Sequence, residues 1–268
     1  MTPNIADAKD QLYNCTKNFH YYSGAYITTN EYLRETLKLL PNGANNALTV
    51  AASGDHPMFT MLYTAKHVDT FDLSFNAKLI MDIKTKALQL LNHEEYRQLL
   101  EDLAAAHNRF RHFCSVNNME KIIPNLSKFE QEYIQKLGTH KLFISDSCDD
   151  MSLPTEQEFL QMRNVIKKPF GFIWSDITNL HAHLTKKYDF IHLSNIFDYM
   201  PHEGCMNALS SLARHTNPGC NICFVWFRNN KVKEVLLDFL DLDSMTESPQ
   251  LWTFGELPKH TLFLHRMR

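Results

Sequence analysis

Small polar residues and carboxylates stand directly after short apolar runs of the sequence. Ser53-Gly54-Asp55 follows the run Ala47-Leu-Thr-Val-Ala-Ala52, and Asp72 closes the next run, eighteen positions after the glycine (72 − 54). An acidic residue about 20 positions after a glycine turn is typical of sites that bind a ribose, because one carboxylate can accept hydrogen bonds from both hydroxyls. Asp69 lies inside its run, so Asp72 is the stronger candidate.

The glycine turn at Ser53-Gly54 supports two interpretations. A glycine lets the backbone approach a ligand closely, and the helix that follows would offer free N–H groups beside it. A single glycine is not the G-x-G-x-x-G pattern, so a dinucleotide pyrophosphate would be poorly bound. A ligand without phosphate groups needs fewer glycines in the loop that binds it. An ordinary tight turn explains the residues equally well.

Two later runs end in the same way. Trp174-Ser-Asp-Ile177 offers the Asp176 carboxylate to the exocyclic amine of an adenine, with Ile177 or Trp174 against the ring. Asp176 is equally well explained as the cap of a following helix. Polar and aromatic residues are dense in the segment Leu193-Ser-Asn-Ile-Phe-Asp-Tyr-Met-Pro201. The alternative is an ordinary strand-to-helix loop, which is rarely so rich in Asn, Asp, Phe and Tyr.

Alternation of strands and helices must position these residues. The pattern predicts parallel β-α units, and the residue groups above would then meet at the carboxyl ends of the strands, where open α/β sheets bind ligands. The predicted strands are 47–52, 68–72, 170–174, 188–193, 221–227, 251–254 and 261–265, and the predicted helices of these units are 57–65, 75–91, 204–215 and 231–240.

No linker or repeat divides the chain, so residues 1–268 are predicted to form one domain. Residues 1–45 are expected to be a helical cap, since Leu33, Leu37 and Leu40 share a helix face before Pro41-Asn-Gly43. Residues 93–168 are amphipathic and are expected to be a helical insertion that shapes a substrate pocket.

Composition restricts the partners. The 268 residues are 44% hydrophobic with a net charge of −3, and they contain no basic stripe, so nucleic acid is not expected as a principal partner. No run approaches the about 20 apolar residues of a membrane-spanning helix. The polar stretch Met1 to Asp10 is unlike a signal peptide, so a cytoplasmic location is expected by default.

No metal site is predicted. His181-Ala-His183 lacks a third ligand at a plausible spacing, although His56 stands beside the glycine turn. Cys220 and Cys223 form a C-x-x-C within a predicted strand, where residues three apart point to opposite faces. The six cysteines are therefore expected to be free thiols.

Several of these segments together resemble class I S-adenosylmethionine-dependent transferases. They are Ala51-Ala-Ser-Gly-Asp55, Phe71-Asp-Leu-Ser-Phe-Asn76, Tyr188-Asp-Phe-Ile-His-Leu-Ser-Asn-Ile-Phe-Asp-Tyr199 and Ala213-Arg-His-Thr-Asn-Pro-Gly219. More narrowly, they look like the betaine-lipid-type 3-amino-3-carboxypropyltransferase family. The similarity covers roughly residues 45–92 and 170–230, and Pro218-Gly219 has one glycine where methyltransferases often have two.

The resemblance implies a Rossmann-like class I methyltransferase sheet, which the predicted antiparallel C-terminal hairpin also fits, and S-adenosylmethionine as co-substrate. The reaction would be methyl or 3-amino-3-carboxypropyl transfer to a small molecule; the alternative is a non-catalytic protein that binds S-adenosylmethionine. The implied cofactor-binding residues are Ser53, Gly54, Asp55, Asp72, Asp176, Ile177 and Asn195.

The acceptor side of such a site is assigned to five residues. Asp198 and Tyr199 are candidates to orient or deprotonate an acceptor, and a base is needed only if the nucleophile is an amine or hydroxyl that must lose a proton. Tyr22 and Tyr26 could close over the amino-acid end of the cofactor, and Arg228 could hold a carboxylate through two hydrogen bonds. Surface tyrosines and strand-end arginines are also common without such roles.

Overall fold

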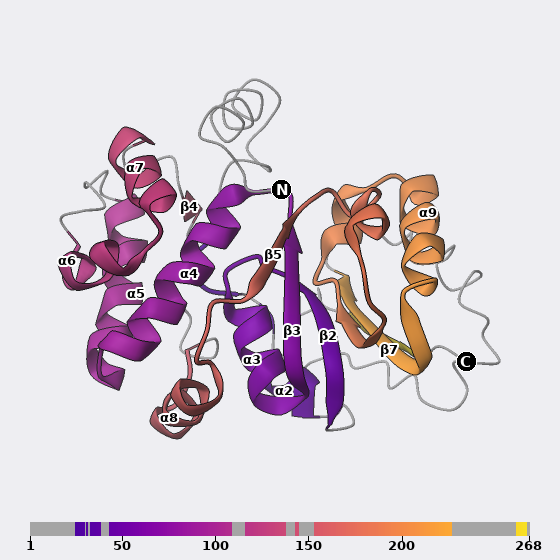
Figure 1. Cartoon of the computed structure of the whole chain (residues 1–268), viewed down its shortest axis with the longest axis horizontal. Coiled ribbons are helices and arrows are strands. Elements are labelled where there is room, and N and C mark those ends of the chain that lie inside the picture. Colours follow the sequence, from indigo (N-terminus) through magenta and orange to yellow (C-terminus); the bar gives the residue numbers. More distant parts are fainter. Residues whose placement is uncertain are drawn as a thin grey trace.

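A six-stranded sheet forms the centre of the protein (Figure 1). The computed structural model describes residues 25–29, 31, 33–38, 43–108, 116–137, 143–144, 153–226 and 261–266. The strand order is β5-β3-β2-β6-β7-β8; the first five run parallel and β8 runs antiparallel to β7. The strands are β2 (Ala44–Val50), β3 (Ala65–Asp72), β5 (Gly171–Trp174), β6 (Tyr188–His192), β7 (Thr216–Trp226) and β8 (Thr261–Arg266).

The direction of winding reverses between β2 and β6. The chain passes from β2 outward through β3 to β5, and then returns to β6, on the other side of β2, before continuing to β7. This strand order is the Rossmann-like class I methyltransferase arrangement that the sequence predicts. The crevice of such a sheet lies at the reversal, beyond the carboxyl ends of β2 and β6.

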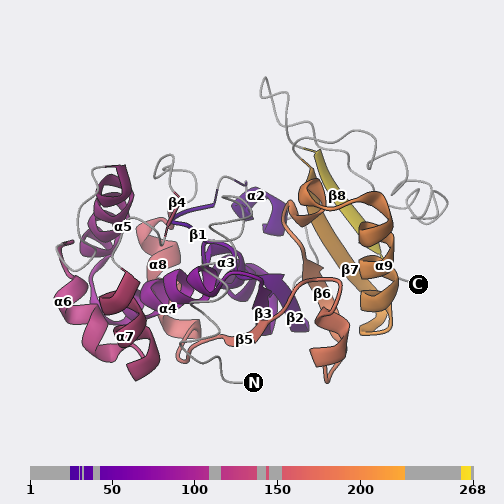
Figure 2. The same ribbon diagram turned by 90° about the horizontal axis from the view of Figure 1, so that it is seen from above.

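Helices cover both faces of the sheet, as Figure 2 shows from above. One face packs against α3 (Asp55–Tyr63) and α4 (Phe75–Leu90), with α2 (Leu33–Lys38) and α8 (Glu156–Val165) beyond them. The other face packs against α9 (His202–Ala213), η4 (Leu180–His183) and η5 (Ile196–Tyr199). Central strands buried on both sides account for the short apolar runs in the sequence.

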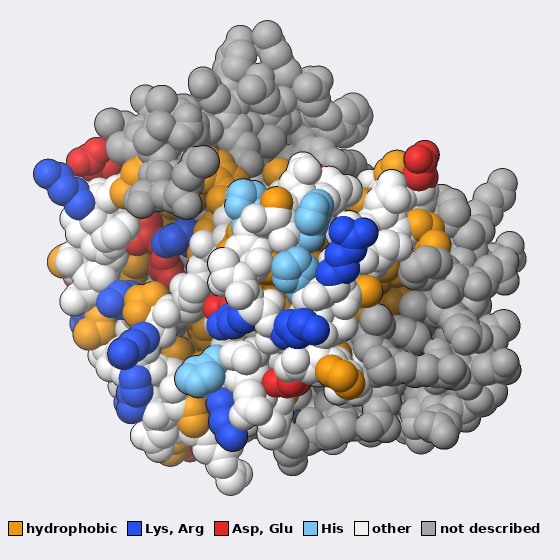
Figure 3. Space-filling view, turned by 45° about the vertical axis from the view of Figure 1, so that its right-hand side comes forward, with side chains coloured by type: hydrophobic (Ala, Val, Ile, Leu, Met, Phe, Trp, Pro, Cys, Tyr) orange, Lys and Arg blue, Asp and Glu red, His pale blue; other side chains and the backbone are white. Residues whose placement is uncertain are grey.

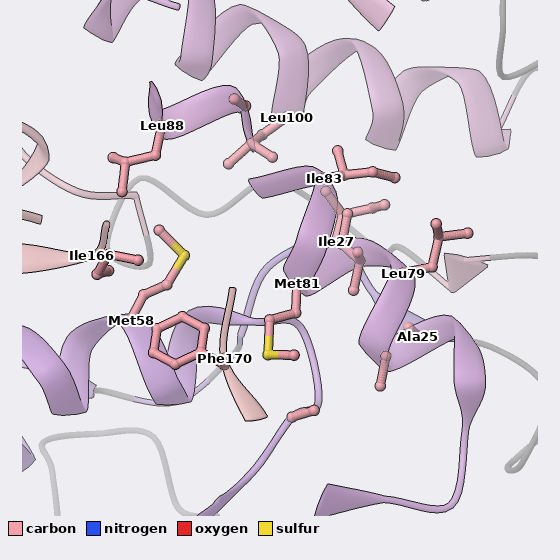
Figure 4. Close-up of a cluster of buried hydrophobic side chains, with 14 of the residues drawn as sticks. Ala25, Ile27, Met58, Leu79, Met81, Ile83, Leu88, Leu100, Ile166 and Phe170 are labelled. Carbon is pink, nitrogen blue, oxygen red and sulfur yellow. The ribbon is translucent and has the colours of Figure 1, made fainter. Parts of the chain in front are cut away.

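The larger core lies between the sheet and the first helical layer. Figure 4 shows side chains from separate elements meeting there, among them Met58 of α3, Met81 and Leu88 of α4, and Leu100 of α5 (His93–Asn108). All four are at most 1% exposed. A side chain of this size contributes roughly 1.5–3 kcal/mol when it is fully buried, so this layer is a main source of stability.

The region 93–168 is helical as predicted but also contains a strand. Its described elements are α5, α6 (Met119–Ile122), η2 (Ile123–Asn125), α7 (Lys128–Leu137), β4 (Phe143–Ile144) and α8. β4 pairs in parallel with β1 (Ala25–Tyr26), so the predicted cap and the insertion are joined through a two-stranded sheet. Pairing between distant segments leaves no local pattern, which is why neither strand was expected.

Several element boundaries differ from the predicted ones. β7 begins at Thr216 instead of 221, and α3 begins at Asp55 instead of 57. The helix predicted at 231–240 and the strand predicted at 251–254 lie outside the described residues, as do residues 1–24 of the predicted cap. Among the described helices, none is long and apolar enough to cross a membrane.

Candidate functional site

Four loops meet at the carboxyl edge of the sheet. They follow β2, β3, β5 and β6, which are the four neighbouring strands around the reversal of strand order. Backbone hydrogen bonds join the first three loops: Ala51 N donates to Phe71 O at 2.8 Å, and Ser175 N donates to Asp72 O at 3.2 Å. The sequence correctly predicts that the residues after these strands share one edge.

Asp72 lies at the centre of this edge. Its Oδ2 accepts from Ala52 N at 2.9 Å and its Oδ1 accepts from Ser74 N at 2.8 Å, so the carboxylate fixes the loop after β2 to the start of α4. Burial raises the pKa of Asp72 to about 6, although backbone N–H groups and the nearby His56 oppose the shift. The side chain is therefore held in place and titrates close to neutral pH.

The loop after β2 has a constrained backbone. Ala52 has φ 45° and Gly54 has φ 83°, both in the left-handed region. A Cβ at Gly54 would lie 2.8 Å from Cα of Met81, so the close approach at this glycine is made by helix α4. Glycine is needed here for helix packing as well as for the turn.

Asp55 is committed to a buried ion pair. Lys84 Nζ donates to Asp55 Oδ1 at 2.5 Å, and Thr29 N and Ser53 Oγ both donate to Oδ2 at 2.8 Å. Lys84 is 0% exposed and Asp55 2%. These contacts use both carboxylate oxygens, so Asp55 and Ser53 fix the loop and the N-terminal segment in position.

Asp176 and Ile177 lie beside Asp72 along the edge. Asp176 Oδ1 accepts from Thr178 N and from Thr178 Oγ1, both at 2.7 Å, so it stabilises the turn before η4. The N-cap residue of η4 is Asn179, so Asp176 is not the helix cap that the alternative interpretation expected. Its side chain is half-buried, and Ile177 belongs to the core below α9. One oxygen of Asp176 thus stabilises this turn, and the other is not used in these two contacts.

The loop after β6 carries the predicted acceptor residues. Asn195 Nδ2 donates to the Tyr199 hydroxyl at 3.4 Å, and Asp198 N donates to Asn195 O at 3.0 Å within the turn of η5. Tyr199 is 38% exposed. Tyr26 is also exposed, at 42%, on β1, whereas Tyr22 and Arg228 lie outside the described residues.

A second polar cluster at this edge was missed by the sequence analysis. Glu31, His56 and His192 are buried together, with His56 Nε2 3.3 Å and His192 Nε2 3.9 Å from Glu31 Oε2. Ser194 Oγ donates to Glu31 Oε1, and Ser194 has φ 53°. Only His56 had a signal in the sequence, because Glu31 lies in a segment expected to be helix and His192 inside an apolar run.

The cluster holds a charged side chain directly beside a neutral one. Burial acts to raise the pKa of Glu31, but His56, His192 and Ser194 outweigh it and hold the pKa at about 2. Burial, together with His56, lowers the pKa of His192 to about 3. At neutral pH an ionised carboxylate therefore lies beside a neutral imidazole.

The cysteines match the expectation from the sequence. Cys205, Cys220 and Cys223 are free and buried among the described residues. Cys220 packs in the core below α9 and Cys223 in the core below α3 and α4, so the C-x-x-C side chains lie on opposite faces of β7. His181 lies in η4, where Nδ1 contacts Thr178 O at 3.2 Å.

Comparison with known proteins finds similarity only among solved structures. No protein-family model matches the chain, and no curated protein matches its sequence. The N-methyltransferase NodS from Bradyrhizobium japonicum WM9 in complex with S-adenosyl-L-homocysteine has a TM-score of 0.45 at 11% identity, covering 87% of this chain and 83% of that chain.

Two further structures give similar values. Magnesium protoporphyrin IX methyltransferase (ChlM) from Synechocystis PCC 6803 with bound SAM has a TM-score of 0.44 at 10% identity, covering 88% of this chain and 75% of that chain. The rRNA methyltransferase aviRa from Streptomyces viridochromogenes has a TM-score of 0.41 at 11% identity, covering 88% and 82%. The similarity is remote, and the fold assignment rests on the strand order itself.

Proposed function

We propose that this protein is an S-adenosylmethionine-dependent transferase that acts on a small molecule. The observation that carries the proposal is Asp72, a half-buried carboxylate at the end of β3, next to the reversal of strand order, held by backbone N–H groups of Ala52 and Ser74. Open α/β sheets bind nucleoside ligands at this place, with the acidic residue on the ribose.

The Asp72 carboxylate has capacity for a ligand. Backbone N–H groups of Ser74, Ala52 and Leu73 stabilise it. A carboxylate offers about four lone-pair positions, so at least one further hydrogen bond, from a ribose hydroxyl, can be accepted. The fixed orientation lowers the entropic cost of binding, since the side chain does not need to be ordered by the ligand.

The neighbouring loops suit the remaining parts of the cofactor. Asp176 would accept from the adenine amine with the oxygen not used in the contacts to Thr178, and Ile177 would give the ring an apolar neighbour. Asn195 belongs to the loop after β6, on the other side of the reversal, where the methionine part would extend. Ser53, Gly54 and Asp55 shape the loop beneath.

Transfer from a sulfonium depends chiefly on alignment. The enzyme holds the nucleophile, the electrophilic carbon and the sulfur in line, and proximity and orientation supply most of the acceleration. Asp198 and Tyr199 would orient the acceptor or remove its proton, while Tyr22, Tyr26 and Arg228 would contact the substrate or the amino-acid end of the cofactor. Methyl transfer leaves S-adenosylhomocysteine, and 3-amino-3-carboxypropyl transfer leaves methylthioadenosine.

Calorimetry of cofactor binding tests the proposal. We expect Asp72→Asn to weaken binding of S-adenosylmethionine by a factor of about 10 to 150, the value of one hydrogen bond to a charged group. Asp69→Asn is the matched control, because Asp69 lies on the same strand but contacts Lys186 and the Tyr188 hydroxyl. Equal affinity of the wild type and Asp72→Asn would contradict the proposal.

Product analysis separates the reactions. The protein is incubated with S-adenosylmethionine and a metabolite extract, and mass spectrometry identifies the sulfur-containing product. S-adenosylhomocysteine identifies a methyltransferase and methylthioadenosine an aminocarboxypropyltransferase. Tight binding without either product, unaffected by Tyr199→Phe, would identify the alternative, a non-catalytic protein that binds S-adenosylmethionine.

A small-molecule acceptor agrees with the charge distribution. On the face in Figure 3, Lys and Arg side chains stand as separate groups between polar and apolar surface, rather than as a continuous basic stripe. Nucleic-acid binding depends on such a stripe to neutralise phosphates. The expected cytoplasmic location stays a prediction from the sequence.

A further inference from the structure

Several buried nitrogen and oxygen atoms at the carboxyl edge lack hydrogen-bond partners among the described residues. They include Glu31 Oε2, both ring nitrogens of His56, and His192 Nε2. Glu31 Oε2 and His56 Nε2 are 3.3 Å apart, which is an ion-pair distance, but no hydrogen bond joins them. The side chains of these three residues are at most 4% exposed, so water does not readily satisfy these atoms. Leaving buried polar groups unpaired is costly, and such groups in native proteins usually point to a missing partner.

The three side chains converge on one point. One ligand atom from each of Glu31, His56 and His192 lies within 4.8 Å of the other two. They come from the segment after β1, the start of α3 and the end of β6, so only the folded protein brings them together. We infer that these two imidazoles and this carboxylate bind one divalent transition-metal ion, such as Zn²⁺.

The distances are close to those of a coordination sphere. With metal–ligand bonds of about 2.0–2.1 Å, neighbouring ligand atoms of a tetrahedral site lie about 3.3 Å apart. Glu31 Oε2 and His56 Nε2 are already 3.3 Å apart, and Glu31 Oε2 and His192 Nε2 are 3.9 Å apart. Small movements of the imidazole rings would complete the site.

The ligand chemistry also fits. Two imidazoles and one carboxylate are the protein ligands of many catalytic zinc and non-haem iron sites, which keep a coordination position open. A divalent cation would compensate the buried Glu31 carboxylate, which needs a partner charge in this environment. Ser194 Oγ donates to the other oxygen of Glu31, the kind of outer contact that orients a metal-binding carboxylate.

Metal binding would change one hydrogen bond. Ser194 N now donates to His192 Nδ1 at 3.3 Å. Coordination through Nε2 puts the ring proton on Nδ1, so that Nδ1 and Ser194 N can no longer share a hydrogen bond. The amide of Ser194 should therefore respond to the metal ion.

The location gives the site a relation to the proposed reaction without depending on it. Glu31, His56 and His192 lie at the carboxyl ends of β2 and β6, beside the loop that Asp72 fixes. Binding of a metal ion is measured without any cofactor, so failure of either proposal leaves the other standing.

Calorimetry with Zn²⁺ on chelator-treated full-length protein tests the inference, with metal content measured after gel filtration. We expect one Zn²⁺ per chain and a rise in the thermal unfolding midpoint. Glu31→Gln and His192→Asn should each abolish the stoichiometric binding. The matched control is the double variant His181→Ala, His183→Ala. It removes two histidines that lie close together in the sequence but outside the cluster, and it should bind Zn²⁺ like the wild type.

Two further measurements protect the test against a variant that does not fold. Ser194→Ala removes only the outer hydrogen bond and should weaken Zn²⁺ binding about 10- to 100-fold. Co²⁺ bound to the wild type should give the visible absorption of a low-coordinate site with nitrogen ligands. Absence of stoichiometric Zn²⁺ binding to the wild type, or unchanged binding in a folded Glu31→Gln variant, would overturn the inference.

Discussion

At each end of the central sheet an aspartate accepts two backbone hydrogen bonds, but the pKa values of the two aspartates shift in opposite directions. At the amino end, Asp189 Oδ2 accepts from Asn45 N at 2.8 Å and from Asn46 N at 3.0 Å. At the carboxyl end, Asp72 accepts from Ala52 N and Ser74 N. Burial acts to raise both pKa values, but hydrogen bonds prevail at Asp189, whose pKa is lowered, whereas burial prevails at Asp72.

The difference in pKa shift between Asp189 and Asp72 shows that this fold places strained backbone and poorly solvated polar groups at the carboxyl end of the sheet. The amino end has solvated polar contacts, such as Lys66 Nζ to Asn45 Oδ1 at 3.0 Å. The carboxyl end collects positive φ angles at Ala52 and Ser194, unpaired buried atoms and a carboxylate with a raised pKa. Strain of this kind persists where surrounding structure enforces it, and it clusters at functional sites.

The largest expected effect comes from a lysine at the carboxyl end. Lys84→Met leaves the buried Asp55 carboxylate without its cation and should lower the free energy of unfolding by about 3–5 kcal/mol. Lys66→Met, at the solvated amino end, should change it by less than about 0.5 kcal/mol. Chemical denaturation monitored by circular dichroism measures both, and equal losses would remove the distinction between the two ends.

Two glycines with positive φ provide the next comparison. Gly54→Ala adds a methyl group 2.8 Å from Met81 Cα as well as left-handed strain, so we expect a loss of about 2–5 kcal/mol. Gly43→Ala, at φ 99° before β2, meets no atom within 4 Å and should lose only the about 1–2 kcal/mol of left-handed strain. The same unfolding experiment applies; a smaller loss at position 54 would mean that α4 moves freely.

The smallest effect concerns pH. The ionised form of Asp72 is needed to accept a ribose hydroxyl, so affinity for S-adenosylmethionine should fall about tenfold for each pH unit below about 6. Calorimetry between pH 5 and pH 8 measures this, and Asp72→Asn should bind weakly with no dependence on pH over that range. A wild-type affinity that stays constant down to pH 5 would contradict the assignment.

Asp189 sharpens the pH comparison because its shift has the opposite sign. Its lowered pKa contributes stability above the unfolded pKa, about 3.9, and that stability is lost as the pH falls. Ionisation of Asp72, whose pKa is raised, instead costs stability as the pH rises toward about 6. Unfolding of Asp189→Asn and Asp72→Asn across pH should therefore deviate from the wild type in opposite directions.

Local pattern was sufficient to predict the sheet and part of the site. Runs such as 47–52 and 188–193 are buried on both faces, and each loop that follows a parallel strand must come to the same edge. The position of Asp72 follows from this rule alone. The separation of Cys220 and Cys223 follows from the alternation of side chains along a strand. The strand predicted at 261–265 is confirmed as β8 (Thr261–Arg266). It runs antiparallel to β7, and its expected hairpin partner at 251–254 lies outside the described residues.

Tertiary contacts decided the rest. Glu31 reaches the edge because the N-terminal segment crosses it, where Thr29 N donates to Asp55. The ion pair of Asp55 with Lys84 joins α3 to α4. No spacing within the sequence encodes these approaches, so residues that act through them could not be assigned in advance.

The hydrogen bond from Ser194 to Glu31 spans 163 positions of the chain. During synthesis, the Glu31 carboxylate can therefore form this hydrogen bond only after β6 and Ser194 have left the ribosome. In the same way, β1 can pair only after β4 has been synthesised. Closing such long stretches of chain costs entropy before the contact forms, so this edge of the sheet adds to the barrier to folding.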